Sequence, residues 1–374
     1  MEWIFPHYTE SITSEYWNDL AKRYNWISDM TETIQDSIHH AEGNVAIHTQ
    51  MVLKELLNDV DYQALNTQDK HILFAAVMFH DVEKRSTTLV DENGRVTAIG
   101  HSKRGEKTTR LILYKDIPTP FVIREHICNL VRLHGLPIWA IDNDDPNKAV
   151  IDSSLRVNNK MLEILARCDV KGRICDDKDD LLERIELFKE LCIDNKCYGQ
   201  PRVFETNRSR YNYLNNGGSP DYVPFEKDSF IVYLMSGVAG SGKDTWISRN
   251  LNNVPIISLD DIRREMKIKP GDKKGNGQVI QLAKEKAKEY LRVKTSFVWN
   301  GTNITKQLRA QLIELFMTYS ADVEIVYIET NYTNLLKQNS SRVYELPKNA
   351  IEKMILKREV PTYSEATNIR YVVW

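Results

Sequence analysis

The first half of the chain carries a helical pattern of apolar residues. Between residues 15 and 197, apolar side chains recur at intervals of three and four positions. An α-helix completes a turn in about 3.6 residues, so these intervals place the apolar side chains on one face of each helix. The pattern predicts an all-α region, and its clearest sets are Val45, Met51, Val52, Leu56 and Leu57; Ile123, Ile127, Leu130 and Val131; and Met161, Leu162 and Leu165.

A turn-rich stretch ends this pattern. Residues 198–201 and 215–220 are rich in Gly, Pro and Asn, and Pro224 follows them. These residue types end helices and favour turns. We therefore expect a linker between two domains here.

Short β-rich runs begin after this stretch, and a helix-like segment follows each of them. Strands that alternate with helices form a parallel sheet through right-handed crossovers. The second half is therefore predicted to be an α/β domain, with strands at residues 230–235, 254–259, 295–299 and 323–328.

The length agrees with more than one domain. A chain of 374 residues is long enough for two or three domains of about 150 residues each. We expect a multidomain protein with an all-α domain at residues 1–205, a linker at 206–228 and an α/β domain with a parallel sheet at 229–374.

The charge balance by itself identifies no partner. Lys and Arg number 50 and Asp and Glu number 52, which gives a formal net charge of −2. A protein without an overall positive field binds nucleic acid only through a local basic surface.

Membrane insertion and secretion are not expected. The longest apolar runs are far shorter than the roughly 20 residues that cross a bilayer. The amino-terminal residues do not form the basic and apolar regions of a signal peptide. The 5 cysteines include no C-x-x-C pair, which argues against a disulfide framework and a zinc ribbon. We therefore expect a cytoplasmic protein.

A phosphate-binding motif follows the first predicted strand. Residues 237–243 read GVAGSGK, which satisfies G-x-x-x-x-G-K, and a helix-like segment comes next. In this context the backbone N–H groups surround phosphate oxygens and the lysine reaches the β- and γ-phosphates. We expect ATP or another nucleoside triphosphate with Mg²⁺ to bind at Gly237, Gly240, Ser241, Gly242, Lys243, Asp244 and Thr245.

One position departs from the usual motif. The Ser or Thr that binds Mg²⁺ after the lysine is replaced by Asp244, and Thr245 follows. A carboxylate is a hard oxygen ligand that suits Mg²⁺, although its charge also repels phosphate unless the ion lies between them. Asp244 is therefore our candidate magnesium ligand.

Two carboxylates follow the second predicted strand. Asp260 and Asp261 lie at its carboxyl end, where open parallel sheets bind their ligands. We expect Asp261 to cap the next helix. Asp260 is then the candidate base that accepts a hydroxyl proton during phosphoryl transfer.

These motifs resemble those of the polynucleotide kinase family from residue 230 to the end of the chain. The resemblance implies that Asp260 is the general base and that Lys243 acts on the phosphates. It also implies that Arg263 binds the acceptor phosphate and that Arg342 stabilises the γ-phosphate in the transition state. Two positions depart from the family, since Gly301 replaces a carboxylate and Gln338 replaces an arginine.

A second set of candidate residues lies in the helical half. His80 and Asp81 end a strongly apolar segment, His48 lies upstream on an amphipathic helix, and Asp169 lies downstream on another. Imidazole and carboxylate groups together suit divalent transition metals, and helix bundles assemble such sites from facing helices. His101 and His126 are candidates for a second metal position, ahead of His134, and Lys84 is a candidate phosphate ligand.

The order H…HD…D resembles the HD phosphohydrolase superfamily over residues 44–172. The segments HTQMVL, FHDVEK and ARCDVKGR look like the HD domains attached to transfer-RNA nucleotidyltransferases. The resemblance implies an HD-type helical domain that hydrolyses phosphoesters with Mn²⁺, Ni²⁺, Co²⁺, Zn²⁺ or Fe. Cys168, beside Asp169, is expected to be a buried structural thiol.

Together the two halves resemble bifunctional RNA end-healing enzymes. The family implies removal of a 2′,3′-cyclic phosphate or 2′-phosphate by the first domain and phosphorylation of a 5′-hydroxyl by the second. The expected partners are RNA or DNA ends and a downstream RNA ligase. Two alternatives stay open: an HD nucleotidase fused to a nucleoside or other small-molecule kinase, and a nucleotide sensor without turnover.

Overall fold

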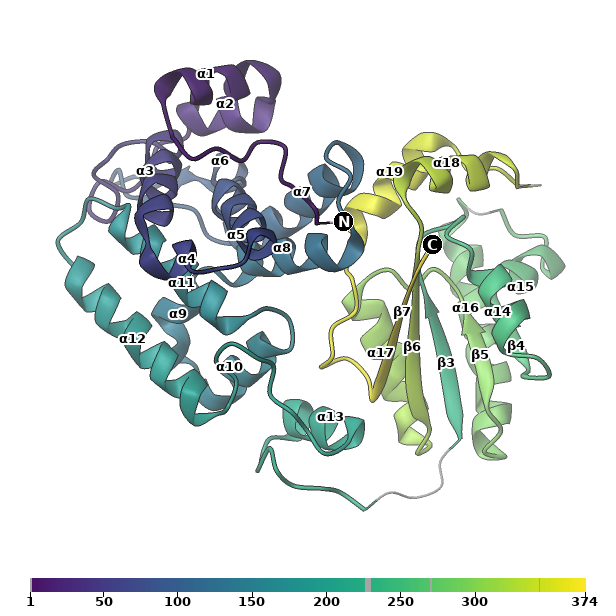
Figure 1. Cartoon of the computed structure of the whole chain (residues 1–374). Helices are drawn as coiled ribbons and strands as arrows, with labels where there is room; N and C mark the ends of the chain where they lie inside the picture. The colour runs from purple at the N-terminus through teal and green to yellow at the C-terminus, as the bar shows by residue number, and fades with distance from the viewer. Residues whose placement is uncertain (1, 226–229, 270, 343) are drawn as a thin grey trace. The chain divides into compact units, whose positions relative to one another are not determined.

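The chain forms two compact units in the computed structural model (Figure 1), which describes residues 2–225, 230–269, 271–342 and 344–374. The first unit is Met1–Val203 and the second is Phe204–Trp374. Within the described residues, no helix combines the length and the apolar composition that a bilayer crossing requires.

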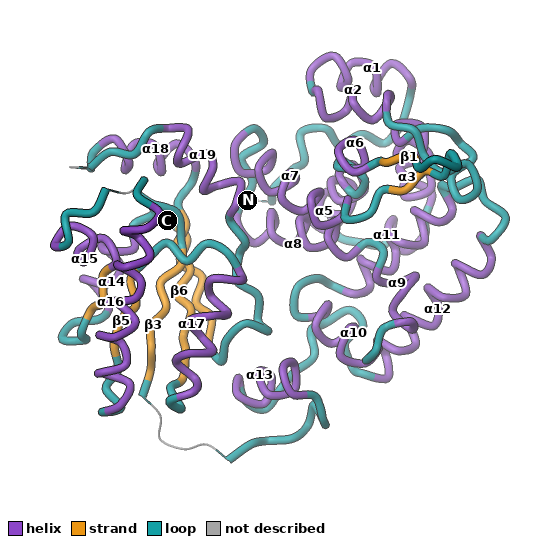
Figure 2. The backbone as a smooth tube through the Cα atoms, turned by 180° about the vertical axis from the view of Figure 1, so that it is seen from behind, coloured by secondary structure: helices purple, strands orange, loops and turns teal. Residues whose placement is uncertain are grey.

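The first unit consists almost entirely of helices (Figure 2). The one sheet among its described residues is a hairpin of two short antiparallel strands, β1 and β2. The elements are α1 (Ser14–Arg23), α2 (Asn25–Glu32), α3 (Val45–Asn58), α4 (Val60–Gln63), α5 (Thr67–Phe79), α6 (Lys84–Thr87), β1 (Leu89–Val90), β2 (Val96–Thr97), α7 (His101–Lys115), α8 (Phe121–Leu133), α9 (Leu136–Trp139), the 3₁₀ helix η1 (Ala140–Asp142), α10 (Pro146–Ser154), α11 (Asn159–Lys171) and α12 (Lys178–Asp194).

Helix α5 is the centre of this unit. All nine residues from 71 to 79 are buried, and the helix packs against α3, α8 and α11. A helix that is apolar on every side is stable only when neighbours cover it completely. The core therefore fixes the carboxyl end of α5, where His80 and Asp81 follow.

A close contact between α3 and α11 sets the distance between these two helices. A Cβ atom on Gly172, at the end of α11, would lie 2.6 Å from Val52 Cγ2 and 2.8 Å from the Val52 nitrogen. Only glycine permits this approach without displacing the backbone of α3. The contact brings the helix that carries Asp169 against the helix that carries His48.

The second unit is a five-stranded parallel sheet with helices on both faces. The strand order is β4-β5-β3-β6-β7, and every pair is parallel. Its elements are α13 (Asn207–Asn216), β3 (Ile231–Ser236), α14 (Lys243–Asn250), β4 (Ile256–Ser258), α15 (Leu259–Glu265), α16 (Lys273–Arg292), β5 (Phe297–Asn300), α17 (Lys306–Thr318), β6 (Asp322–Glu329), α18 (Tyr332–Ser340), α19 (Lys348–Lys357) and β7 (Asn368–Val373).

Alternating residues of the strands bury the two faces of this sheet. Val232 and Leu234 of β3 pack with α16 and α17 in one apolar cluster. Met235 belongs to a second cluster, with Trp246 and Ile247 of α14. Because side chains alternate along a strand, the two clusters lie on opposite faces, as a doubly covered parallel sheet requires.

The predicted order of a helical region and a parallel α/β domain is confirmed. Strands β3, β4, β5 and β6 lie at the four predicted runs, whereas β7 is a fifth strand that the sequence pattern did not indicate. The stretch expected to be a linker carries helix α13, whose Arg210 donates to the Thr367 carbonyl at 2.6 Å. Residues 226–228 of that expected linker, and residue 229, lie outside the described residues.

The buried pair of Arg309 and Glu365 gives a test of this fold. Arg309 is fully buried, and its Nε and Nη2 donate to the two Glu365 oxygens at 2.7 and 3.0 Å. We expect Arg309→Ala to lower the free energy of unfolding by about 3–5 kcal/mol, because it leaves a buried carboxylate without its partner.

The control is Arg370→Ala, which removes an ion pair with Glu324 whose arginine side chain is 56% exposed. Its expected cost is about 0–1 kcal/mol. Urea denaturation of the full chain measures both, and equal costs would contradict the assignment of Arg309 as a buried structural charge.

Candidate functional site

The four residues of the predicted H…HD…D set meet at one point in the helical unit. His48 Nε2 lies 2.9 Å from Asp169 Oδ1 and 3.4 Å from His80 Nε2. Asp81 Oδ2 lies 3.3 Å from His80 Nε2 and 3.7 Å from His48 Nε2. All four side chains are buried. The side chains of α3, α11 and the end of α5 thus converge at one point.

Three histidines of the region share one orienting contact. His80 Nδ1 donates to the Val77 carbonyl at 2.7 Å, and His101 and His134 make the same contact, each at 2.8 Å, with the carbonyl three residues earlier. A carbonyl only accepts, so Nδ1 carries a proton in each, and Nε2 has a free lone pair in the neutral imidazole. The backbone therefore prepares three imidazoles as metal ligands.

His48 is oriented by a carboxylate instead. Its Nδ1 lies 2.9 Å from Glu42 Oε1, and the same carboxylate contacts His40 Nδ1 at 2.8 Å and accepts from the Ile174 N–H at 3.0 Å. A carboxylate behind a metal-binding imidazole fixes its tautomer and raises its basicity. His40 was expected to have no functional role, and Glu42 belongs to no motif that would indicate one.

A second group of ligand atoms lies beside the first. Atoms of Asp81, His101 and His134 lie within 4.8 Å of one another, as do atoms of His48, His80 and Asp169. His101 Nε2 lies 3.2 Å from His134 Nε2 and 3.4 Å from Asp81 Oδ1. Asp81 thus presents Oδ2 to the histidines of the first group and Oδ1 to His101 of the second, so it would serve as a ligand at either position.

The donor set fits divalent transition metals. Imidazole nitrogens and carboxylate oxygens are ligands of Mn²⁺, Fe, Co²⁺, Ni²⁺ and Zn²⁺. Asp81 Oδ1 is buried and, within the part of the chain that the structure describes, accepts no hydrogen bond of good geometry. A buried carboxylate oxygen without a donor is costly unless a cation completes it.

The charges around the two aspartates keep them ionised. Burial opposes ionisation of Asp81, but Lys84, whose Nζ lies 2.8 Å away, and His80 outweigh it and hold the pKa of Asp81 well below its usual range. Arg173 and His48 do the same for the pKa of Asp169. Burial lowers the pKa of His134 to about 3, so its imidazole stays neutral, as a metal ligand must be.

His126 does not join the cluster, which corrects the expectation for this residue. Its Nε2 accepts from the Asn158 N–H at 3.3 Å, and burial lowers its pKa to about 4. His134, the weaker candidate from the sequence, belongs to the second group instead. The feature that distinguishes His134 is its position directly after α8, where the end of a helix can project an imidazole. Cys168 is buried, as expected, and belongs to none of the metal-competent groups among the described residues.

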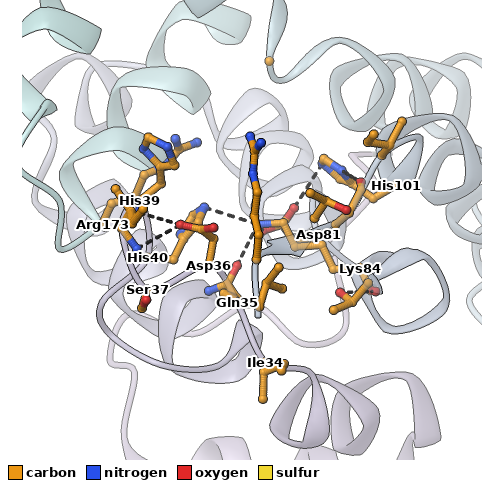
Figure 3. Close-up of a pocket in the computed structure, with 18 of the residues that line it drawn as sticks. Ile34, Gln35, Asp36, Ser37, His39, His40, Asp81, Lys84, His101 and Arg173 are labelled. Carbon is orange, nitrogen blue, oxygen red and sulfur yellow. Dashed lines mark hydrogen bonds and ion pairs between the residues drawn. The ribbon is translucent and has the colours of Figure 1, made fainter. Parts of the chain in front are cut away.

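A cavity of about 1000 Å³ lies over this cluster (Figure 3). Asp81, His101 and Asp169 line it, together with the cationic side chains of Lys84, Arg173 and Arg95. Lys84 Nζ also donates to Gln35 Oε1 at 2.7 Å, so its position is fixed. An anionic ligand in this cavity would meet both cations and metal ligands.

The α/β unit carries the phosphate loop between β3 and α14. Gly237, Gly240 and Gly242 have φ of 150°, 83° and 97°. A Cβ on Gly237 would lie 2.4 Å from the Ile328 carbonyl oxygen, so this position requires glycine. The loop leads into α14, whose amino-terminal N–H groups favour a phosphate.

Lys243, the first residue of α14, extends its side chain back to the loop. Its Nζ donates to the Gly237 and Val238 carbonyls, both at 2.9 Å. Burial lowers the pKa of Lys243 to about 8, with a smaller contribution from Arg342 that Asp244 and Asp260 oppose. A phosphate would supply the negative charge that restores the ordinary pKa.

The segment after β5 supports the loop. The Gly237 N–H donates to the Thr302 carbonyl at 2.9 Å, and Asn303 Nδ2 donates to the Met235 carbonyl at 2.7 Å. Asn300 Nδ2 donates to Asp244 Oδ1 at 2.7 Å, so the carboxylate in the usual magnesium position is held by the strand next to β3. Gly301 offers no carboxylate. Asp244, which is bonded to the preceding residue Asn300, is the carboxylate at this position.

The two carboxylates after β4 differ from the expectation in one respect. Ser258, not Asp261, caps α15 by accepting from the Asp261 N–H at 3.2 Å, while Asp261 pairs with Arg264. Serine is as good a helix cap as aspartate. Asp260 forms an ion pair with Arg263, and Arg263 Nε donates to Asn276 Oδ1 at 2.8 Å.

These residues share a cavity of about 540 Å³. Asp260, Arg263 and Arg342 line it, and Arg342 Nη1 is buried without a hydrogen-bond partner among the described residues. Arg249 and Trp374 also line it, and neither belongs to a motif that predicts this. The members of the predicted site in this cavity are Gly240, Gly242, Lys243, Asp244, Thr245, Asp260, Arg263 and Arg342.

The α/β unit is similar to known proteins. Residues 232–361 match the family model of the AAA domain, and with the loop geometry this makes the unit a P-loop domain. A candidate kinase from Chloroflexus aurantiacus is 13% identical over 39% of this chain and 89% of its own, with a TM-score of 0.34. A sugar kinase from Janibacter sp. is 13% identical over 39% of this chain and 86% of its own, with a TM-score of 0.31.

His126, within α8, and His134, at its carboxyl end, allow a matched test of the metal groups. We expect His134→Ala to weaken binding of one divalent ion by at least about tenfold, because it removes a ligand nitrogen. His126→Ala should leave the affinity for Mn²⁺ within about twofold of the original. Calorimetric titration with Mn²⁺ measures both, and an equal loss in the two variants would contradict the assigned groups.

Arg342 allows a second test in the P-loop cavity. We expect Arg342→Ala to weaken ATP binding by about tenfold or more, since a hydrogen bond between charged groups contributes about 1.5–3 kcal/mol. Lys337→Ala, on the exposed side of α18, is the control and should change the affinity less than twofold. Titration of the full chain with ATP and Mg²⁺ distinguishes the two.

Proposed function

We propose that this chain is a bifunctional RNA end-healing enzyme. Its helical unit would remove a 2′,3′-cyclic phosphate or a 2′-phosphate, and its α/β unit would transfer the γ-phosphate of a nucleoside triphosphate to a 5′-hydroxyl. The observation that carries the proposal is that one chain contains both a candidate metal cluster and a phosphate loop.

The helical unit supplies what phosphoester hydrolysis requires. When bound, divalent ions polarise phosphoryl oxygens and lower the pKa of water. The chain's own contribution is a set of fixed ligands, His48, His80 and Asp169 in one group and His101 and His134 in the other, with Asp81 between them.

The expected reaction is the addition of water to the phosphorus. One phosphorus–oxygen bond to the ribose breaks, and the released ribose oxygen takes a proton. Lys84 and Arg173 line the same cavity and balance the charge that Asp81 and Asp169 bring.

The α/β unit supplies the groups for phosphoryl transfer. Asp260 would take the proton of the acceptor hydroxyl, whose oxygen then attacks the γ-phosphorus while the bond to the β-phosphate breaks. Lys243 and Arg342 balance the charge on the phosphates, and Asp244 would hold Mg²⁺. All four side chains line one cavity, as in-line transfer requires.

A basic surface favours a polynucleotide as the acceptor. Lys267, Lys269, Lys273 and Lys274 are exposed, and none of the four forms an ion pair within the described ranges. Arg263 connects this surface to the cavity, because it lines the cavity and is held by Asn276, in the first turn of α16. Exposed lysines attract a chain of phosphates more strongly than an uncharged nucleoside.

The test uses one RNA that carries both termini. The purified chain is incubated with ATP, Mg²⁺, Mn²⁺ and an oligonucleotide with a 5′-hydroxyl and a 2′,3′-cyclic phosphate. We expect a new 5′-phosphate and an opened or removed terminal phosphate at the 3′ side. Phosphorylation of a free nucleoside but not of the RNA would overturn the proposal in favour of a small-molecule kinase.

Two variants separate the sites. Lys243→Ala should lower 5′ phosphorylation at least about 100-fold and leave the 3′ reaction within twofold, because it changes charge only in the P-loop cavity. Asp81→Ala should give the reverse, since it removes a ligand from both metal groups. If neither variant changes an activity, the assignment of these residues is wrong.

A further inference from the structure

The cavity over the His and Asp cluster is larger than a phosphate group needs. Its volume is about 1000 Å³, in the upper part of the range for small-molecule sites. Its lining divides into two chemical kinds. Metal-ligating and cationic side chains form one part, and large apolar side chains with high exposure form the other.

The apolar part includes a tryptophan. Trp139 lines the cavity and is 55% exposed. Ile34, Ile38 and Ile99 line the same cavity and are 51%, 72% and 87% exposed. A single exposed apolar residue is ordinary on a protein surface, but four in the cavity that holds a candidate catalytic centre indicate a ligand with an apolar face.

Trp139 has neighbours that restrict its position. It ends the short helix α9, whose Pro137 and Ile138 are buried and which packs against α11 and α12. The guanidinium of Arg184 lies 5.4 Å from the centroid of the indole ring and donates to Asp142 Oδ2 at 2.7 Å. The buried residues before Trp139 and the contact with Arg184 restrict the indole in the free protein. The indole therefore loses less entropy when a ligand binds.

The flat ring and the phosphate chemistry occur in one cavity. Asp81, His101 and His134 provide the ligand atoms for metal-assisted phosphoester hydrolysis, and Trp139 provides an aromatic surface. A nucleotide is a phosphoester that carries an aromatic ring of its own, joined to the phosphate through a ribose. Stacking on tryptophan suits every base, because each base has a π-face.

We propose that Trp139 is the nucleobase-binding residue of the phosphoesterase site. The inference rests on the proposed function of the helical unit and names its substrate class. The substrate is a nucleoside 2′,3′-cyclic phosphate or 2′-phosphate, free or at the end of an RNA, whose terminal base stacks on the indole. Phosphoesters without a base gain nothing from this residue.

The test compares two substrates in the full chain loaded with Mn²⁺. One is adenosine 2′,3′-cyclic phosphate, and the other is glycerol 1,2-cyclic phosphate, which has the same phosphodiester ring and no base. We expect Trp139→Ala to raise KM for the adenosine substrate about 5- to 150-fold, the ratio that corresponds to one stacked base. The change in kcat should be small, and kcat/KM for the glycerol substrate should fall far less.

Trp139→Phe is the rescue variant, because it keeps an aromatic face on the same backbone. It should recover most of the affinity for the adenosine substrate, whereas a role in packing alone would not depend on the base. An equal loss on both substrates, or no loss on either, overturns the proposal.

A binding measurement separates this inference from the proposed function. If the original chain hydrolyses neither these cyclic phosphates nor adenosine 2′-phosphate, the proposed phosphoesterase activity fails. Titration with adenosine 2′-phosphate and with glycerol 2-phosphate then still tests Trp139. Tighter binding of the adenosine compound that Trp139→Ala abolishes supports the base platform, and equal affinities contradict it.

Discussion

The approach of α11 to α3 at Gly172 is the constraint on which the helical unit depends. Because the Gly172 backbone lies against Val52, the two helices come close enough for Asp169 to reach His48. The buried core around α5 fixes the third part of the cluster, since His80 and Asp81 follow directly from its carboxyl end. A metal site of this kind is therefore a product of helix packing, and the chemistry of its residues matters only once that packing is set.

The two units position their polar groups by the same means, through the backbone. In the helical unit, carbonyl groups at the ends of turns hold three imidazoles in one tautomer. In the α/β unit, the loop between β3 and α14 and the segment after β5 bond to one another through Gly237 and Thr302. Backbone groups cannot rotate away as side chains do, so both sites are prepared before a ligand arrives.

The sequence predicted the regular parts of this protein and the strongest motifs. Periodicity identified the helical half and four strands, because apolar spacing reports directly on which side of an element is buried. It missed β7, where Arg370 and Asn368 interrupt the apolar run of an edge strand. It also favoured His126 over His134 as a metal ligand, because spacing along a chain does not show which side chains face the cluster in the folded protein. Glu42 has no motif at all, and only the folded chain brings it to His48.

The contacts of Lys243 have a consequence for the design of variants. Its ammonium group ties together two carbonyls at the start of the phosphate loop, Gly237 and Val238. Replacing the lysine by alanine therefore removes two hydrogen bonds that stabilise the loop, as well as a positive charge for the phosphates. An arginine or a shorter amine at this position would separate the two effects, because each keeps a cation while altering its reach into the turn.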